Sequence, residues 1–265
     1  MKTKALLAGL GLLSSDPGIS RELRDFCVDR PGLGTPACTI DAQHVAVELG
    51  LVDWSVDRSA GGRTDSIALS DILIRYGLSN SLEAQIGWQG LGVVRQRKSS
   101  GAVDHSTGTG DVRIALRQSL INPDGSGLSL AVMPFFTIPI GRSGIGENDW
   151  SAGVLLPVSF ELSDELQVAF TGEIEHAADE QGSSHHLAYG GTVGIEAPLT
   201  DDLSGTFELA AKRNDERSQP STQFLTGASA AWLISPSFQL DAGINLGLNR
   251  STSDLELYVG LAKRF

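Results

Sequence analysis

The sequence predicts an all-β protein: a transmembrane, antiparallel, up-and-down β-barrel of about twelve strands. Three observations predict this fold. From residue 43 onward, apolar residues alternate with small or polar residues at a period of two, which is typical of strands with two different environments. Short turns alternate with longer polar loops, as in barrels that cross a membrane. The expected strands are also long enough to cross at a tilt, which takes about 9–11 residues.

The composition of the chain is compatible with this fold and argues against other classes. The 265 residues carry a net charge of −12, which argues against a nucleic-acid partner because phosphate binding requires clustered Lys and Arg. No apolar run approaches the 18 or so residues of a transmembrane helix. A soluble β-sandwich would fit the same totals, so the strand pattern has to separate the two folds.

The N-terminal residues contain an apolar stretch and then a cysteine loop. Residues 1–15 resemble a secretory signal peptide, shortened and without a clear cleavage site; a frayed apolar terminus is the alternative. We expect residues 16–41 to form a periplasmic segment and residues 42–265 to form the barrel. Two Pro and two Gly separate Cys27 from Cys38, so a disulfide is expected in an oxidising compartment. The alternative, a two-thiol metal site, lacks a Cys-x-x-Cys spacing.

The strands follow one another with regular alternation. In the first, Val45 and Val47 share one face, and Glu48 and Gly50 share the other. The second changes register between Leu69 and Ile72, which predicts a bulge. The expected strands cover residues 43–56, 65–76, 81–96, 110–121, 128–139, 150–162, 166–177, 187–199, 203–213, 222–234, 237–249 and 254–265.

The connections and the aromatic residues also fit a membrane barrel. Residues 77–80 and 200–202 read as short periplasmic turns, whereas 98–109 and 178–186 read as longer, polar outside loops. An even number of strands places the first and the last residue of the barrel on the periplasmic side. Aromatic side chains near strand ends are expected to form the interfacial girdles: Tyr76, Trp150, Phe160, Phe224, Trp232 and Phe238.

If the apolar face contacts lipid, the polar face lines the lumen. Charges at this density require a wet or hydrogen-bonded interior, because an unpaired charge in a dry core is costly. We hypothesise that Arg113 and Arg117 face an acidic wall across a narrow pore and orient polar solutes. Salt bridges that only rigidify the barrel are the alternative. The candidate residues of the solute path are Arg75, Glu83, Asp111, Arg113, Arg117, Glu173, Glu175, Glu196, Glu208, Lys212 and Asp241.

Several segments resemble a known family. These segments are residues 24–41 with the cysteine loop, Leu73–Leu78, Pro134–Gly141 and the terminal Phe265. They resemble the outer-membrane transporter family linked to the MetA (meta-cleavage) pathway of phenol degradation, over most of residues 24–265. The resemblance implies a barrel in the bacterial outer membrane that takes up small, often aromatic, compounds. The alternating last strand that ends on Phe265 also resembles the C-terminal signal that such proteins present to their assembly machinery.

The sequence therefore predicts an outer-membrane channel for passive uptake of small solutes, with membrane lipid and a small-molecule solute as partners. We expect no cofactor, no metal site and no enzymatic activity. His176 could lie at a lipid-facing rim, as in barrel lipid hydrolases, but no serine is expected beside it. The pair His185 and His186 could bind a metal, although adjacent loop residues are usually only solvated. A structural or surface-interaction barrel with a closed lumen is the other alternative.

Overall fold

The computed structural model describes residues 23–147, 149–163, 165–179 and 184–265. The expected signal peptide lies outside the described residues. Among the described residues, no helix is long and apolar enough to cross a membrane. The strands are β1 (Val45–Ser59), β2 (Gly62–Gly77), β3 (Leu82–Lys98), β4 (Val103–Gly108), β5 (Val112–Ile121), β6 (Leu128–Ile138), β7 (Ser151–Ser163), β8 (Leu166–Ala178), β9 (His185–Pro198), β10 (Leu203–Asn214), β11 (Ser221–Ser235), β12 (Phe238–Gly247) and β13 (Leu255–Arg264).

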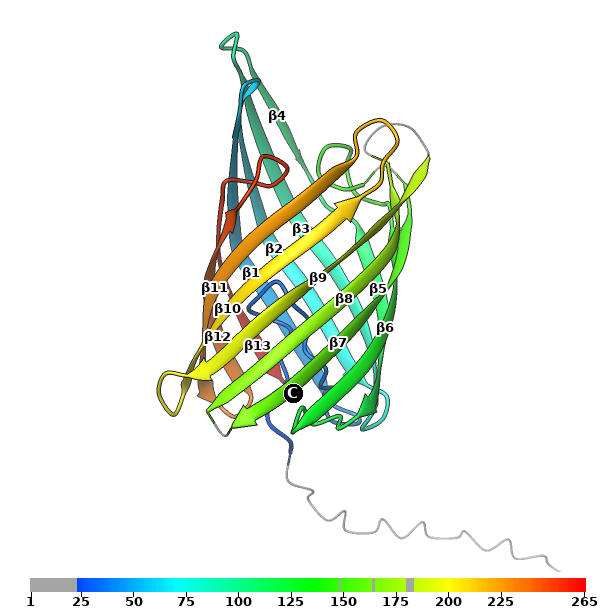
Figure 1. Ribbon diagram of the computed structural model, residues 1–265, viewed down its shortest axis with the longest axis vertical. Helices are drawn as coiled ribbons and strands as arrows, with labels where there is room; N and C mark the ends of the chain where they lie inside the picture. The colour runs from blue at the N-terminus through cyan, green and yellow to red at the C-terminus, as the bar shows by residue number, and fades with distance from the viewer. Residues whose placement is uncertain (1–22, 148, 164, 180–183) are drawn as a thin grey trace, which may run out of the picture.

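These strands form one closed antiparallel barrel (Figure 1). The sheet closes because β1 pairs with both β2 and β13, and β2 also pairs with β3. β4 and β5 occupy one position in the wall, since they pair with the upper and lower parts of β3. The wall therefore has twelve strand positions, and the predicted fold class is confirmed. A closed wall leaves no unpaired strand edge, which is the requirement for any sheet in hydrocarbon.

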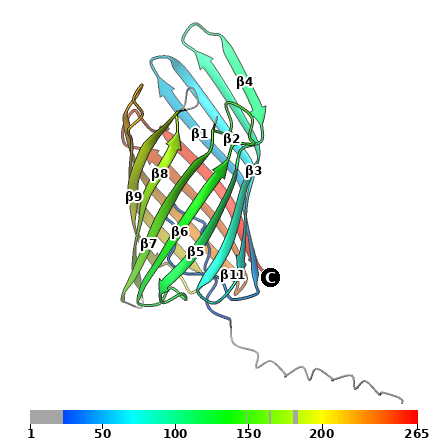
Figure 2. The same ribbon diagram turned by 90° about the vertical axis from the view of Figure 1, so that its right-hand side faces the viewer.

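The segment from 98 to 109 differs from its prediction. It was expected to be a polar loop, but Val103–Gly108 forms β4, which pairs with the end of β3 in a hairpin that projects beyond the rest of the rim (Figures 1 and 2). Above the membrane both faces of a strand contact water, so no alternation of polarity marks it in the sequence.

The irregularity expected between Leu69 and Ile72 is found at Ser70, whose φ is +56°, and the neighbouring β1–β13 pairing shifts register between Gly50 and Val52.

The wall has apolar side chains on its outer face and charged side chains on its inner face, which is the reverse of a soluble protein. Large apolar side chains point outward and are exposed, such as Ile174 (54% exposed) and Phe207 (53%). The buried groups inside are charged, among them Arg75, Glu83 and Arg117. An apolar surface of this extent is stable against lipid and not against water. Five of the six predicted girdle aromatics are exposed on this surface: Tyr76, Trp150, Phe160, Phe224 and Trp232.

The N-terminal segment lies inside the barrel. Residues 23–42, which we call the plug, run through the lower half of the lumen (Figures 1 and 2). The predicted disulfide between Cys27 and Cys38 is present and closes the plug into a loop. The sequence placed residues 16–41 in the periplasm, so the position of the plug differs from that placement. The reason is that its polar backbone finds hydrogen-bond partners on the inner wall, as the next subsection describes.

Candidate functional site

A cluster of buried charges holds the base of the plug against β1, β2 and β3. The Arg75 guanidinium is fully buried and donates to both oxygens of Glu83, at 3.0 and 2.9 Å, and to Glu48 at 3.0 Å. It also donates to the carbonyl oxygen of Cys27 in the plug, at 2.7 Å. Its Nη1 lies 3.1 Å from the carboxylate of Asp29. Arg75 therefore joins three carboxylates of the wall and the plug.

Arg117 on β5 completes this cluster. Its Nη2 donates to both oxygens of Asp29, at 2.8 and 2.7 Å, and its Nη1 donates to the carbonyl oxygen of Cys38 at 3.1 Å. The same nitrogen lies 3.2 Å from Glu83. The wall thus holds both ends of the disulfide loop through two arginines. Buried pairs of this kind need good geometry and many hydrogen bonds to offset their desolvation, and every nitrogen of the two guanidinium groups except Arg117 Nε has a hydrogen-bond partner.

The upper part of the plug is held by backbone hydrogen bonds to the opposite wall. Glu208 on β10 accepts from the amides of Leu33 and Gly34, at 2.6 and 2.8 Å. A Cβ added at Gly32, whose φ is +129°, would lie 2.9 Å from a Glu208 oxygen, so glycine is required there. On β12, Asp241 pairs with Arg30 of the plug at 3.0 Å.

A chamber of about 240 Å³ lies above the tip of the plug. It is lined by apolar, hydroxyl and charged side chains, among them Leu33, Thr35, Arg113, Leu155, Thr171, Glu173, Lys212 and Leu225. The Arg113 guanidinium carbon lies 3.6 Å from the centre of the Phe135 ring. Its Nε and Nη2 are buried without a hydrogen-bond partner, and it forms no ion pair with the described residues. Two of the three guanidinium nitrogens of Arg113 therefore lack a hydrogen-bond partner in the protein.

The mouth of the barrel contains a second cavity of about 420 Å³, partly lined by Glu147, Glu175, Lys212 and Glu216. Lys212 pairs with Glu175 at 2.8 Å and with Glu173 at 3.4 Å. Desolvation raises the pKa of the Glu147 carboxyl in the connection from β6 to β7, and the negative charge of Glu175 raises it further. The mouth therefore combines closely spaced acids with one shared cation.

Two other predicted site residues lie at the two ends of the lumen. Asp111 accepts from the amides of Gly141 and Glu147, at 2.7 and 2.6 Å, so it fixes the loop between β6 and β7. Glu196 lines a lower cavity of about 210 Å³ between the plug and the wall. The mouth and the chamber share Lys212, and the chamber and the lower cavity share Thr35. The three cavities therefore follow one another along the lumen, and the plug narrows the passage between the last two.

The structure separates the predicted residues into two groups. Arg75, Glu83, Arg117, Glu208 and Asp241 hold the plug. The others line the cavities or fix the mouth, and they are Asp111, Arg113, Glu173, Glu175, Glu196 and Lys212. Arg113 and Arg117 were expected to act together, yet Arg117 is committed to Asp29 and only Arg113 faces a cavity.

Sequence reasoning missed the plug partners Asp29 and Arg30, together with Phe135 beneath Arg113. The charge count of the lumen could have indicated that another segment of the chain donates hydrogen bonds to the acidic residues of the wall. Seven of the eleven candidate residues of the solute path are acids and four are basic, an excess that calls for donors from elsewhere in the chain. Those donors are largely backbone amides of the plug, at Asp29, Arg30, Leu33 and Gly34.

Comparison with solved structures gives the same fold. The COG4313 outer membrane channel from Pseudomonas putida F1 superposes with a TM-score of 0.71 at 14% identity, covering 89% of this chain and 100% of that one. The KdgM porin, solved with disordered oligogalacturonate, gives 0.52 at 12% identity, covering 84% and 99%. The translocator domain of the autotransporter NalP from Neisseria meningitidis gives 0.54 at 12% identity, covering 89% and 90%. The barrel is thus of the bacterial outer-membrane type, as predicted.

Comparison of the sequence with known proteins identifies the family. None of the curated proteins compared with the chain matches it. The model of the family described as "Putative MetA-pathway of phenol degradation" matches residues 28–265, from the plug to the last residue. This agrees with the resemblance carried by the cysteine loop and by Pro134–Gly141. The chain therefore belongs to this phenol-degradation family of outer-membrane barrels.

Proposed function

We propose that this barrel is a non-enzymatic channel for passive uptake of small anionic solutes, in particular aromatic carboxylates and phenolates. The observation that carries the proposal is the unpaired Arg113 guanidinium at the wall of the chamber above the plug. A guanidinium presents a fork of donors that matches a carboxylate, so an anionic group of the solute would supply the missing partner.

The size and lining of the chamber support an aromatic body for this solute. A volume of about 240 Å³ accommodates a single substituted ring rather than an oligosaccharide. Leu33, Leu155 and Leu225 provide apolar surface around that ring. The family name, which refers to phenol degradation, agrees with this class.

The proposal is tested by uptake into liposomes that contain the purified full-length chain. Benzoate is compared with benzyl alcohol, which has a similar size and no charge. Arg113→Gln should lower benzoate uptake roughly tenfold, because one charge-assisted hydrogen bond contributes about 1.5–3 kcal/mol. Uptake of benzyl alcohol should change little. The matched control is Arg97→Gln, which alters an exposed arginine of β3 above the wall. Equal benzoate uptake by the Arg113 variant and the control would overturn the proposal.

The plug favours a second candidate function. Residues 23–42 fill much of the lower lumen, so a structural barrel with a closed lumen is consistent with the same contacts. The two candidates differ in the unaltered protein: a channel passes benzoate, whereas a closed barrel passes neither probe. A chain that passes benzoate only after plug contacts are removed would be a gated channel.

Two further predictions belong to this proposal. We expect residues 42–265 to act as the transport unit, with residues 23–41 as a separate segment that docks in it. We expect the assembly machinery to recognise the last strand, whose Phe265 is 69% exposed and donates its amide to the Val45 carbonyl at 2.8 Å. Deleting Phe265 should lower the yield of folded barrel in the outer membrane, measured by heat-modifiable gel migration.

A further inference from the structure

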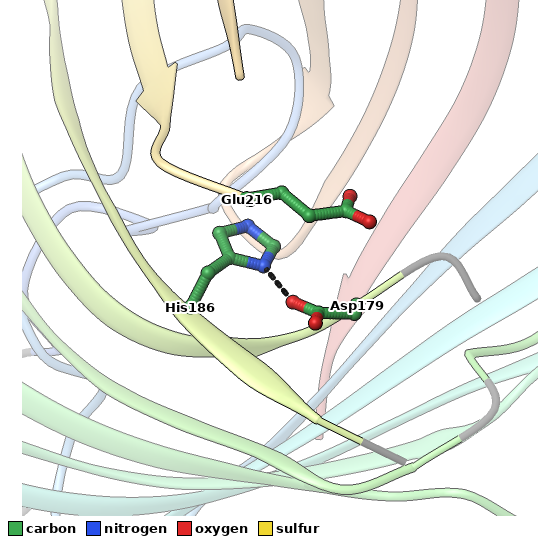
Figure 3. Close-up of side chains that lie close together, drawn as sticks. All are labelled: Asp179, His186 and Glu216. Carbon is green, nitrogen blue, oxygen red and sulfur yellow. Dashed lines mark hydrogen bonds and ion pairs between the residues drawn. The ribbon is translucent and has the colours of Figure 1, made fainter. Parts of the chain in front are cut away.

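Three potential metal ligands converge at the mouth of the barrel. Asp179 directly follows β8, His186 lies near the start of β9, and Glu216 follows β10 (Figure 3). The ligand atoms of the three side chains all lie within 4.8 Å of one another. His186 Nδ1 lies 2.7 Å from Asp179 Oδ1. Side chains from three separate segments are therefore brought to one point that borders the mouth cavity.

The charges of this cluster are not balanced by the protein. Glu216 is only 7% exposed, and Ser218 donates to it at 2.5 Å. Among the described residues, no Lys or Arg lies within 4.0 Å of either the Asp179 or the Glu216 carboxylate. Lys212, which also borders this cavity, is engaged by Glu173 and Glu175. A carboxylate buried to this degree is normally paired with a cation or coordinates a metal, and Glu216 has no such partner among the described residues.

The donor set indicates which cation would fit. One imidazole nitrogen and two carboxylate oxygens form a mixed set that suits zinc and related divalent transition metals, whereas calcium and magnesium prefer oxygen ligands alone. Three protein ligands leave a fourth tetrahedral position for water. Tetrahedral ligand atoms at about 2.0–2.2 Å from an ion lie about 3.3–3.6 Å apart. The three ligand atoms lie within 4.8 Å of one another, so binding would draw the wider pairs together and open the 2.7 Å contact between His186 and Asp179.

We propose that Asp179, His186 and Glu216 form a binding site for a divalent transition-metal ion, with zinc as the representative. The site links the end of β8 and the start of β9 to the segment after β10. The ion also places positive charge at a mouth that is otherwise mainly acidic. The proposal rests on this geometry and not on the proposed solute, so each can fail without the other.

The test is isothermal titration of zinc chloride into the full-length chain in detergent, after treatment with a chelator. We expect one ion per chain. His186→Ala and Glu216→Gln should each weaken binding at least roughly tenfold, as loss of a ligand does. Heat-modifiable gel migration establishes that each variant is folded, and the nearly isosteric Glu216→Gln change gives a second test if His186→Ala does not fold.

The neighbouring histidine provides a matched control. His185 stacks on His176 with ring centroids 4.6 Å apart, and it is not part of the cluster. His185→Ala should bind zinc like the unaltered chain. The proposal is overturned if the unaltered chain binds no zinc, or if binding is lost in His185→Ala and kept in His186→Ala and Glu216→Gln. It is also overturned if His186 takes up only a proton, seen as a histidine titration by NMR that added zinc does not change.

Discussion

Replacing Arg75 by methionine should destabilise the folded chain strongly. Arg75 is 0% exposed and contacts the carboxylates of Asp29, Glu48 and Glu83 within 3.1 Å. In the native cluster two guanidinium groups face these three carboxylates, and the substitution leaves Arg117 alone against all three. Breaking a buried ion pair from one side costs about 3–5 kcal/mol, mainly because the remaining charge stays buried without its partner.

An exposed arginine provides the comparison. Arg58 lies 3.8 Å from Asp254, and both side chains are largely exposed. Pairs of this kind contribute about 0–1 kcal/mol, so Arg58→Met should change stability little. The free energy of unfolding is measured by denaturant titration in detergent micelles, followed by the fluorescence of the four tryptophans.

A double variant, Arg75→Met with Glu83→Gln, tests the same explanation. Adding Glu83→Gln to Arg75→Met removes one of the uncompensated carboxylates, so part of the lost stability should return. The reasoning is refuted if Arg75→Met lies within about 1 kcal/mol of Arg58→Met, or if the double variant is less stable than Arg75→Met alone.

Three further predictions concern the plug and the mouth. Changing Cys27 and Cys38 together to serine should weaken plug docking by about 3 kcal/mol, because the loop that the disulfide closes becomes free in the undocked state. Hydrogen exchange of the plug amides measures this, and unchanged protection would contradict it. Gly32→Ala should weaken docking by about 1–3 kcal/mol through backbone strain and contact with Glu208, and should raise single-channel conductance; an unaltered conductance would count against the docking geometry. Because the pKa of Glu147 is raised, its charge is lost at a higher pH than for an ordinary glutamate as the pH falls. The mouth should then repel anions less, so the permeability to anions relative to cations, measured by reversal potential, should rise over that interval. Glu147→Gln should abolish this step, and a step that persists in the variant would assign it to another group.

The wall of the barrel could be predicted because lipid and water act on it directly. Each crossing strand must present apolar groups outward, and the resulting alternation located β7 and β8 to within one residue at each end. β4 could not be found in this way, because it lies above the membrane with water on both faces. Its residues, Val103–Gly108, carry no contrast of polarity.

The plug could not be predicted because its partners are remote in sequence. Leu33 meets Glu208 across 175 residues, and Arg30 meets Asp241 across 211. No local pattern encodes such contacts, and the Pro- and Gly-rich segment has no periodicity of its own. The inward direction of Arg113 and Arg117 followed from alternation alone, whereas their different roles depend on where the plug ends. Alternation therefore predicts which wall residues face the lumen, but not which of them hold the plug and not the plug residues Asp29 and Arg30.

The contacts at the base of the plug also stabilise the pairing of β1 with β13, which closes the barrel wall. Arg264, on the final strand, donates to the Arg24 carbonyl at 2.7 Å and to Asp41 at 3.3 Å, and its guanidinium lies 5.3 Å from the Phe26 ring. Residues 24–41 thus contact the seam at which β1 and β13 pair. Separating β1 from β13 would require these contacts to break, together with the hydrogen bonds between the two strands. These plug contacts to Arg264 can therefore form only after the final strand has paired.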